Sequence, residues 1–92
     1  MVRPLINRNI RFNPHITYYK PAGIPIKELE EVLIEVDELE ALRLCDSLGL
    51  KQEDAAKKME ISQSTLFRLL NSARNKIANA LINGKAIKIN KK

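Results

Sequence analysis

The sequence lacks most of what a catalytic or disulfide-stabilised protein needs. Among 92 residues it has no tryptophan, one histidine (His15) and one cysteine (Cys45). A single cysteine excludes an intrachain disulfide, so a cytoplasmic location is the default expectation. Because no nucleophile–base spacing and no glycine-rich phosphate loop is present, we expect a protein that is not an enzyme and that holds no metal or other cofactor.

Long apolar runs and aromatic side chains are also scarce. No stretch approaches the roughly 20 apolar residues that a membrane-spanning helix requires, so we expect no membrane association. Phe12, Tyr18, Tyr19 and Phe67 are the only aromatic residues. Leu and Ile must therefore build most of the core, and a chain of this length is expected to form one compact unit.

Acidic residues are absent from both ends of the chain. All 11 lie between Glu28 and Glu60, although the net charge is +5. Two basic flanks are typical of a protein that meets a polyanion, and solvated basic tails are the alternative interpretation.

The first 25 residues predict an extended basic arm. They contain all 4 prolines, which excludes long helices, and residues 16–20 favour a short strand. From Ile26 the pattern fits both a helix and a strand, and we favour a short helix followed by a strand. Asp37 is then the predicted cap of a first helix that ends at Gly49.

Two further helices follow, over residues 51–59 and, after a cap at Ser62, over residues 63–82. The apolar stripe expected on the last helix comprises Leu66, Leu69, Leu70, Ala73, Ile77 and Leu81. Residues 86–90 alternate as an edge strand does. The sequence thus predicts a mainly α fold, with an arm over residues 1–25 and, over residues 26–92, a helix-turn-helix three-helix core with short peripheral β-strands.

The spacing of small and apolar residues indicates a helix-turn-helix within about residues 51–82. Counted from Gln52, the fifth, tenth, fifteenth and eighteenth positions are Ala56, Ile61, Leu66 and Leu69. Glu60 takes the ninth position, where glycine is usual because the backbone is left-handed, at a cost on the order of 1 kcal/mol. An ordinary helical hairpin shares this spacing, but the absence of acidic residues after Glu60 favours a DNA-binding unit.

The candidate DNA contacts follow from this placement. Gln63, Ser64 and Arg68 project from the first turns of the third helix and suit base edges. Thr65, Arg74 and Lys76 are expected to hold the DNA backbone. Arg3, Arg8 and Arg11 of the arm either enter a minor groove or form a solvated tail.

The chain also resembles the UPF0251 (DUF134) family. The resemblance is carried by Tyr19–Lys20–Pro21 with Gly23 and Pro25, by Asp37–Ala41, and by Ser72–Arg74 through Asn83–Ala86. It implies DNA binding through a helix-turn-helix similar to region 4 of bacterial sigma factors. Glu60 departs from the family's turn glycine. Cysteines found in the arm of many relatives are missing between Arg3 and Pro14, so a metal or redox sensor is not expected.

The leading hypothesis is a sequence-specific binder of double-stranded DNA that regulates transcription. A single module reads few base pairs, so a homodimer is expected, formed by pairing of the strand at residues 86–90 or the strand at residues 16–20 between subunits. The alternative is a sigma-like adaptor whose acidic segment, residues 28–60, binds a protein of the transcription machinery. RNA binding is less favoured, because Phe67 is the only aromatic residue on the basic helix.

Overall fold

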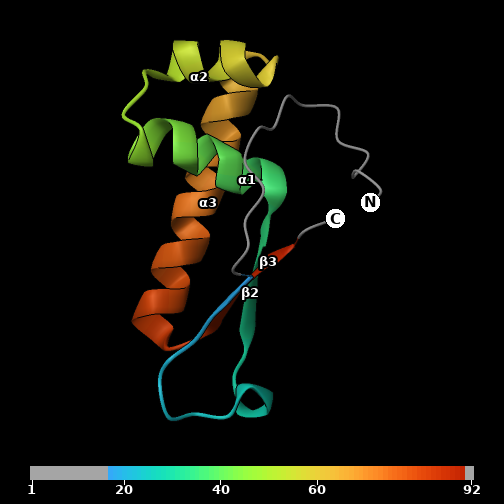
Figure 1. Ribbon diagram of the computed structural model, residues 1–92, viewed down its shortest axis with the longest axis vertical. Helices are drawn as coiled ribbons and strands as arrows, with labels where there is room; N and C mark the ends of the chain where they lie inside the picture. Colours follow the sequence, from blue (N-terminus) through green and yellow to red (C-terminus); the bar gives the residue numbers. More distant parts are fainter. Residues whose placement is uncertain (1–16, 91–92) are drawn as a thin grey trace.

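The computed structural model describes residues 17–90 and is mainly helical, with a small sheet packed beside the helices (Figure 1). In chain order the elements are β1 (Tyr18–Tyr19), the 3-10 turn η1 (Ile26–Glu28), β2 (Glu31–Glu35), α1 (Val36–Leu42), its π-helical continuation η2 (Arg43–Ser47), α2 (Gln52–Met59), α3 (Gln63–Asn83) and β3 (Ala86–Asn90). The predicted helical core with peripheral strands is confirmed. Within this described range no helix is both long and apolar enough to cross a membrane.

The sheet has the order β1-β3-β2, so the last strand lies in the middle. It pairs antiparallel with β1, Tyr18 opposite Lys88, and parallel with β2, Val32 opposite Ile87. The prediction of an edge strand at residues 86–90 is therefore wrong. Alternating side chains report the two faces of a strand but not how many neighbours its backbone has.

The parallel pair β2–β3 needs a long connection, and the three helices supply it (Figure 1). The expected short helix followed by a strand after Ile26 is present as η1 and β2. The predicted cap at Asp37 is wrong. Helix α1 begins at Val36, and Glu35 caps it in a reciprocal arrangement with Glu38. Because β2 runs into α1 without a loop, the end of pairing with β3, at Glu35, decides where the helix begins.

The helices enclose one hydrophobic core. Its fully buried members are Ala41, Leu44, Ala55, Ala56, Met59, Leu66 and Leu70. The alanines of α2 let that helix approach α3 closely, as the helix-turn-helix spacing requires. Leu69 and Ile61 pack at the margin of the same cluster.

The predicted apolar stripe of α3 holds along most of the helix but fails at Leu81. That side chain is 74% exposed, whereas Ala80 is buried. Near its end α3 no longer packs on the other helices but approaches the sheet, where Ala86 is also buried. After Ile77, the next residue of α3 that faces the protein interior is therefore Ala80, three residues on, and not Leu81, four residues on.

Candidate nucleic-acid interface

Helices α2 and α3 are joined by three residues, Glu60, Ile61 and Ser62, at one end of the molecule (Figure 1). Glu60 has φ 60° and ψ 44°, the left-handed conformation predicted for the ninth position of the motif. Its N–H donates to carbonyls of the last turn of α2, and the Ile61 N–H donates to the Ala56 carbonyl over 3.0 Å. The turn is therefore closed by backbone hydrogen bonds.

Ser62 caps α3, as predicted. Its hydroxyl oxygen accepts from the Thr65 N–H over 3.1 Å and its hydroxyl lies 2.9 Å from the Thr65 Oγ1. Arg68 in turn donates from Nη2 to the same Thr65 Oγ1, over 3.2 Å. A short chain of hydrogen bonds thus ties the Arg68 guanidinium to the first turn of the helix.

One face of the first two turns of α3 is open to solvent. Gln63, Ser64 and Arg68 are exposed, while Leu66 and Leu70 face the core on the other side. The first turn contains no acidic residue. Because the N-terminal end of a helix carries partial positive charge, this face suits a negatively charged ligand that also offers hydrogen-bonding groups.

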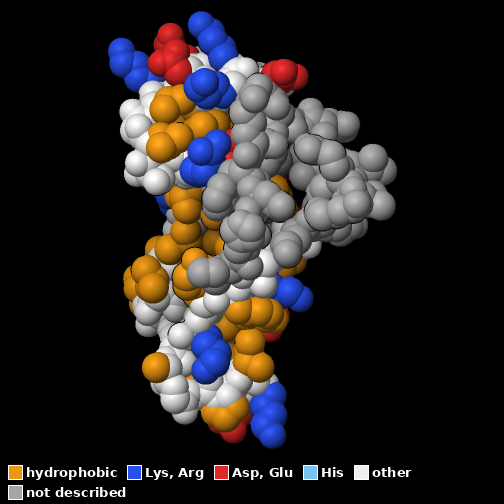
Figure 2. Space-filling model, viewed as in Figure 1, with side chains coloured by type: hydrophobic (Ala, Val, Ile, Leu, Met, Phe, Trp, Pro, Cys, Tyr) orange, Lys and Arg blue, Asp and Glu red, His pale blue; other side chains and the backbone are white. Residues whose placement is uncertain are grey.

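Two lysines extend the basic character of this end. Lys57 and Lys58 lie exposed in the last turn of α2, directly before the turn. Figure 2 shows Lys and Arg side chains at the end of the molecule that holds α2 and the start of α3, with acidic side chains among them. Lys57 and Lys58 are not among the DNA contacts predicted from the sequence, although their position directly before the predicted turn could have indicated them.

Arg74 forms an ion pair with Asp46, away from the start of α3. Its Nε and Nη2 donate to the two carboxylate oxygens of Asp46, over 2.9 and 2.7 Å. These hydrogen bonds lower the pKa of Asp46 and raise that of Arg74. Arg74 also lies about 16 Å along the helix from Gln63. It therefore does not join the exposed face at the start of α3.

Lys76 is committed to the interface between α1 and α3. Its Nζ donates to the Glu38 carboxylate over 2.8 Å, and the Ser72 hydroxyl donates to the same carboxylate. Burial opposes ionisation of Glu38, but the hydrogen bonds from Lys76, Ser72 and the Glu35 N–H outweigh it and lower its pKa. Lys76 is thus a structural residue in this fold.

Two residues of the acidic segment expected to face a protein partner, Glu38 and Glu40, are buried instead. Their relative exposures are 5% and 1%. Glu40 accepts two hydrogen bonds from Arg43, each of 2.9 Å. Acidic residues in a helical segment are usually solvated. The sequence around Glu38 and Glu40 does not indicate that Lys76 and Ser72 of α3 bind the first carboxylate, or that Arg43 binds the second.

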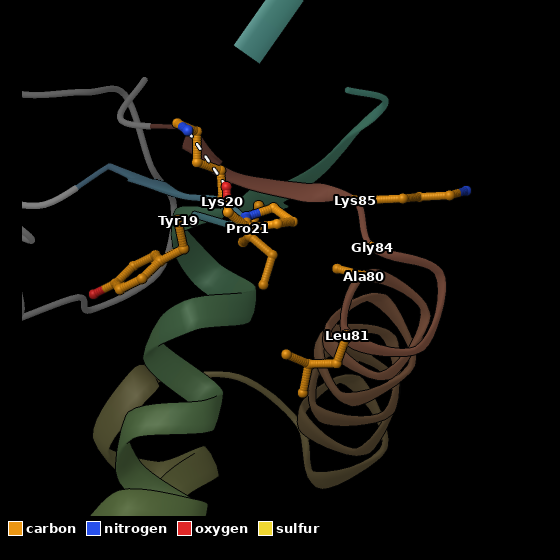
Figure 3. A pocket seen from close by; sticks show the side chains of 8 residues that line it. Tyr19, Lys20, Pro21, Ala80, Leu81, Gly84 and Lys85 are labelled. Atoms are coloured by element: carbon orange, nitrogen blue, oxygen red, sulfur yellow. Dashed lines mark hydrogen bonds between the residues drawn. The ribbon is translucent and has the colours of Figure 1, made fainter. Parts of the chain in front are cut away.

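A shallow pocket of about 210 Å³ lies at the opposite end of α3 (Figure 3). Leu81 points from the helix toward Pro21, whereas Lys85 projects away from the pocket. Beside it, Ile82 is 82% exposed. This end of α3 therefore exposes two large apolar side chains, although Lys20 and Lys85 line the same pocket.

The structure does not describe the candidate residues of the N-terminal arm. Arg3, Arg8 and Arg11, like His15, lie outside the described residues. Across residues 17–90 no group of three or more His, Cys, Asp or Glu side chains is arranged to hold a metal ion. Cys45 is half-buried, and burial raises the pKa of its thiol.

The start of α3 is therefore the candidate interface. The similarity of this chain to known proteins shows the family to which it belongs. A family model described as "Protein of unknown function DUF134" matches residues 1–91. The chain belongs to this family. No solved structure matches it. The similarity to sigma-factor region 4 stays a prediction.

Relatives in the DUF134 family carry the name UPF0251 protein. The one from Moorella thermoacetica is 56% identical over 89 residues, which cover 97% of this chain and 60% of the relative. Those from Caldanaerobacter subterraneus and Dehalococcoides mccartyi are each 54% identical over 89 residues, covering 75% and 76% of their lengths. The chain thus spans less than two thirds of the length of the relative from Moorella thermoacetica.

Proposed function

We propose that this protein binds double-stranded DNA sequence-specifically through the first two turns of α3. The observation that carries the proposal is the exposed row of Gln63, Ser64 and Arg68 on a helix presented by a left-handed three-residue turn. A helix of this kind fits the major groove, where every base pair displays a distinct set of donors and acceptors.

Each side chain has a chemical role in this proposal. Gln63 suits an adenine edge, Arg68 suits guanine, and Ser64 suits a base or a phosphate. The Thr65 hydroxyl already serves Ser62 and Arg68, so its role becomes the positioning of Arg68. The helix N-terminus with Lys57 and Lys58 takes over the contacts to the DNA backbone that Arg74 and Lys76 were expected to make.

The biological use that we propose is transcriptional regulation, by a binding protein and not by an enzyme. One helix reads a few base pairs, which is too little to select a site in a genome. A homodimer that reads two half-sites meets this requirement, with half-sites one helical turn or a multiple of it apart.

Strand pairing through residues 86–90 does not explain such a dimer, because β3 already has a neighbour on each side. Among residues 17–90, β2 is an outer strand of the sheet and carries Glu31 and Glu35, and like charges oppose its pairing with a second copy. We therefore propose that the end of α3 that exposes Leu81 and Ile82 meets the same surface of a second copy. Ile82→Glu should shift the protein to a monomer in analytical ultracentrifugation; a wild-type monomer at the concentration that binds DNA contradicts this proposal.

The adaptor hypothesis loses part of its surface. Two of the glutamates counted in the acidic segment, Glu38 and Glu40, are buried and paired, and the exposed acids fall into two groups, one around η1 and β2 and one at Asp46, Glu53, Asp54 and Glu60. No observation favours a particular protein partner for that surface, and DNA binding is the better supported function.

Selection of bound duplexes from a random DNA pool tests the proposal. The wild type should enrich a defined motif, and Arg68→Ala should relax it at one position by roughly 1 to 3 kcal/mol of lost discrimination. Asn75→Ala, on the same exposed side of α3 but two turns further on, is the matched control and should return the wild-type motif. Weak, salt-sensitive binding that is indifferent to Arg68 contradicts the proposal.

A further inference from the structure

Phe67 is a large apolar side chain left in solvent on the candidate interface. It is 52% exposed, whereas its neighbour Leu66 is fully buried. Successive residues of a helix point about 100° apart, so the core that takes Leu66 and Leu70 cannot also take Phe67. The fold itself therefore gives no reason for a phenyl ring at this position.

The ring stands among the groups proposed to read bases. Gln63 lies four residues before it and Ser64 three residues before it, and both are exposed. Residues at these spacings are neighbours on a helix surface. Phe67 therefore occupies the same face of the first two turns, beside exposed polar side chains.

We propose that Phe67 is a specificity-determining residue that contacts the C5-methyl group of a thymine in the major groove. The inference rests on the proposed DNA binding and adds one base to its readout. The thymine methyl is the apolar group that distinguishes a base edge in this groove, and phenylalanine is a side chain suited to it. Because Gln63 beside it suits adenine, the two together predict A·T pairs in the centre of each half-site.

Two other uses of an exposed phenylalanine fit the surroundings less well. A binding surface for single strands stacks successive bases on several aromatic rings, and Phe67 is the only aromatic residue on α3. An apolar protein partner requires a continuous patch. The other large exposed apolar residues of α3, Leu81 and Ile82, lie about 20 Å further along the helix.

The experiment replaces each thymine of the selected duplex, one at a time, by deoxyuridine, which removes only the methyl group. At one position the wild type should lose affinity about three- to tenfold. Phe67→Ala should bind the thymine duplex more weakly by the same factor and show no further loss with deoxyuridine. Phe67→Leu should keep the sensitivity. Asn75→Ala, which shortens an exposed side chain about two turns further along α3, should behave as the wild type.

The outcomes separate this inference from the function on which it rests. If the wild type binds its motif but no deoxyuridine weakens it, Phe67 reads no methyl group. If Phe67→Ala keeps the loss at the same thymine, another residue reads it and the inference is equally overturned. If the wild type selects no motif at all, the proposed DNA binding fails. Thermal unfolding of each variant checks that its fold is unchanged.

Discussion

Glu60 holds a strained backbone conformation in the three-residue turn between α2 and α3. Among the described residues it is the one non-glycine residue with positive φ. Glycine adopts this conformation without a Cβ clash, although it loses more entropy on folding. Glu60→Gly should therefore stabilise the fold by about 0.5 to 1 kcal/mol, seen as a rise of a few degrees in Tm. Glu60→Asn should give a smaller rise, and a clearly lower Tm for Glu60→Gly contradicts this assignment of the turn.

The Glu38–Lys76 pair should matter more for stability than for DNA binding. The Glu38 side chain is 7% exposed and that of Lys76 32%. Lys76→Met leaves a buried carboxylate without its main partner and should destabilise the fold by about 2 to 3 kcal/mol in urea unfolding. Lys85→Met is the matched control, because the carboxylate that Lys85 meets on Glu30 is 80% exposed, and its effect should stay below about 1 kcal/mol. Equal effects of the two substitutions would contradict a structural role for Lys76.

The same carboxylate gives the fold a defined acid sensitivity. The pKa of Glu38 is below its ordinary value of 4.5 in the folded state. Its contribution to stability is therefore complete above that value and is lost as the pH falls through the lower folded-state pKa. Glu38→Gln should be less stable at pH 7, and its stability should fall less steeply below pH 4.5 in chemical unfolding series. An unchanged acid slope would show that Glu38 does not carry this dependence.

At the scale of elements, the cap of α3 allows stability and DNA binding to be separated. Ser62→Ala removes the acceptor for the Thr65 N–H and should destabilise the fold by about 1 kcal/mol. Ser62→Asp should preserve the cap, because aspartate is as good an N-cap as serine, but it adds negative charge where phosphates are expected. It should therefore keep the wild-type Tm and weaken DNA binding severalfold in a fluorescence titration. Unchanged affinity for Ser62→Asp would place the DNA elsewhere.

The elements that sequence reasoning predicted correctly are those fixed by local chemistry. The cap at Ser62, the left-handed Glu60 and the end of α3, predicted at residue 82 and found at Asn83, each depend on a few neighbouring residues. The errors concern tertiary partners. The beginning of α1 depends on where β2 stops pairing, and the inward position near the end of α3 depends on the sheet.

The candidate site shows the same division. Gln63, Ser64 and Arg68 are exposed as predicted, because a cap and an apolar stripe fix their direction. The ion pairs of Arg74 and Lys76 could not be predicted from the sequence, because their carboxylate partners lie 28 and 38 positions away in the chain. Net charge along the sequence indicated a basic flank, but it did not indicate which cations the fold neutralises.

At the scale of the whole molecule, the central place of β3 makes the C-terminal segment part of the fold. Ala86 and Ile89 are buried, and β3 supports the buried side chains Val32 and Ile34 of β2. Removal of residues 86–92 should therefore unfold the protein, with loss of a cooperative thermal transition in circular dichroism. A folded monomer after this truncation would instead support the hypothesis that residues 86–90 form a strand that pairs between subunits.

The two ends of α3 expose different side chains, Gln63, Ser64 and Arg68 at its start and Leu81 and Ile82 at its end. The helix has 21 residues and therefore spans about 30 Å, so the proposed DNA contacts and the proposed contact with a second copy do not compete for the same surface. The proposed dimer would therefore leave the proposed DNA-binding face of each copy accessible.

The most direct measurement is the ratio of affinities for the selected duplex and for a scrambled duplex of the same composition, at one fixed salt concentration near 0.15 M. Sequence-specific binding through α3 predicts a ratio of about a thousand or more, with a large reduction in Arg68→Ala. Equal affinities for the two duplexes, falling together as salt rises, would show that only the charge of the protein meets DNA and would contradict recognition by α3.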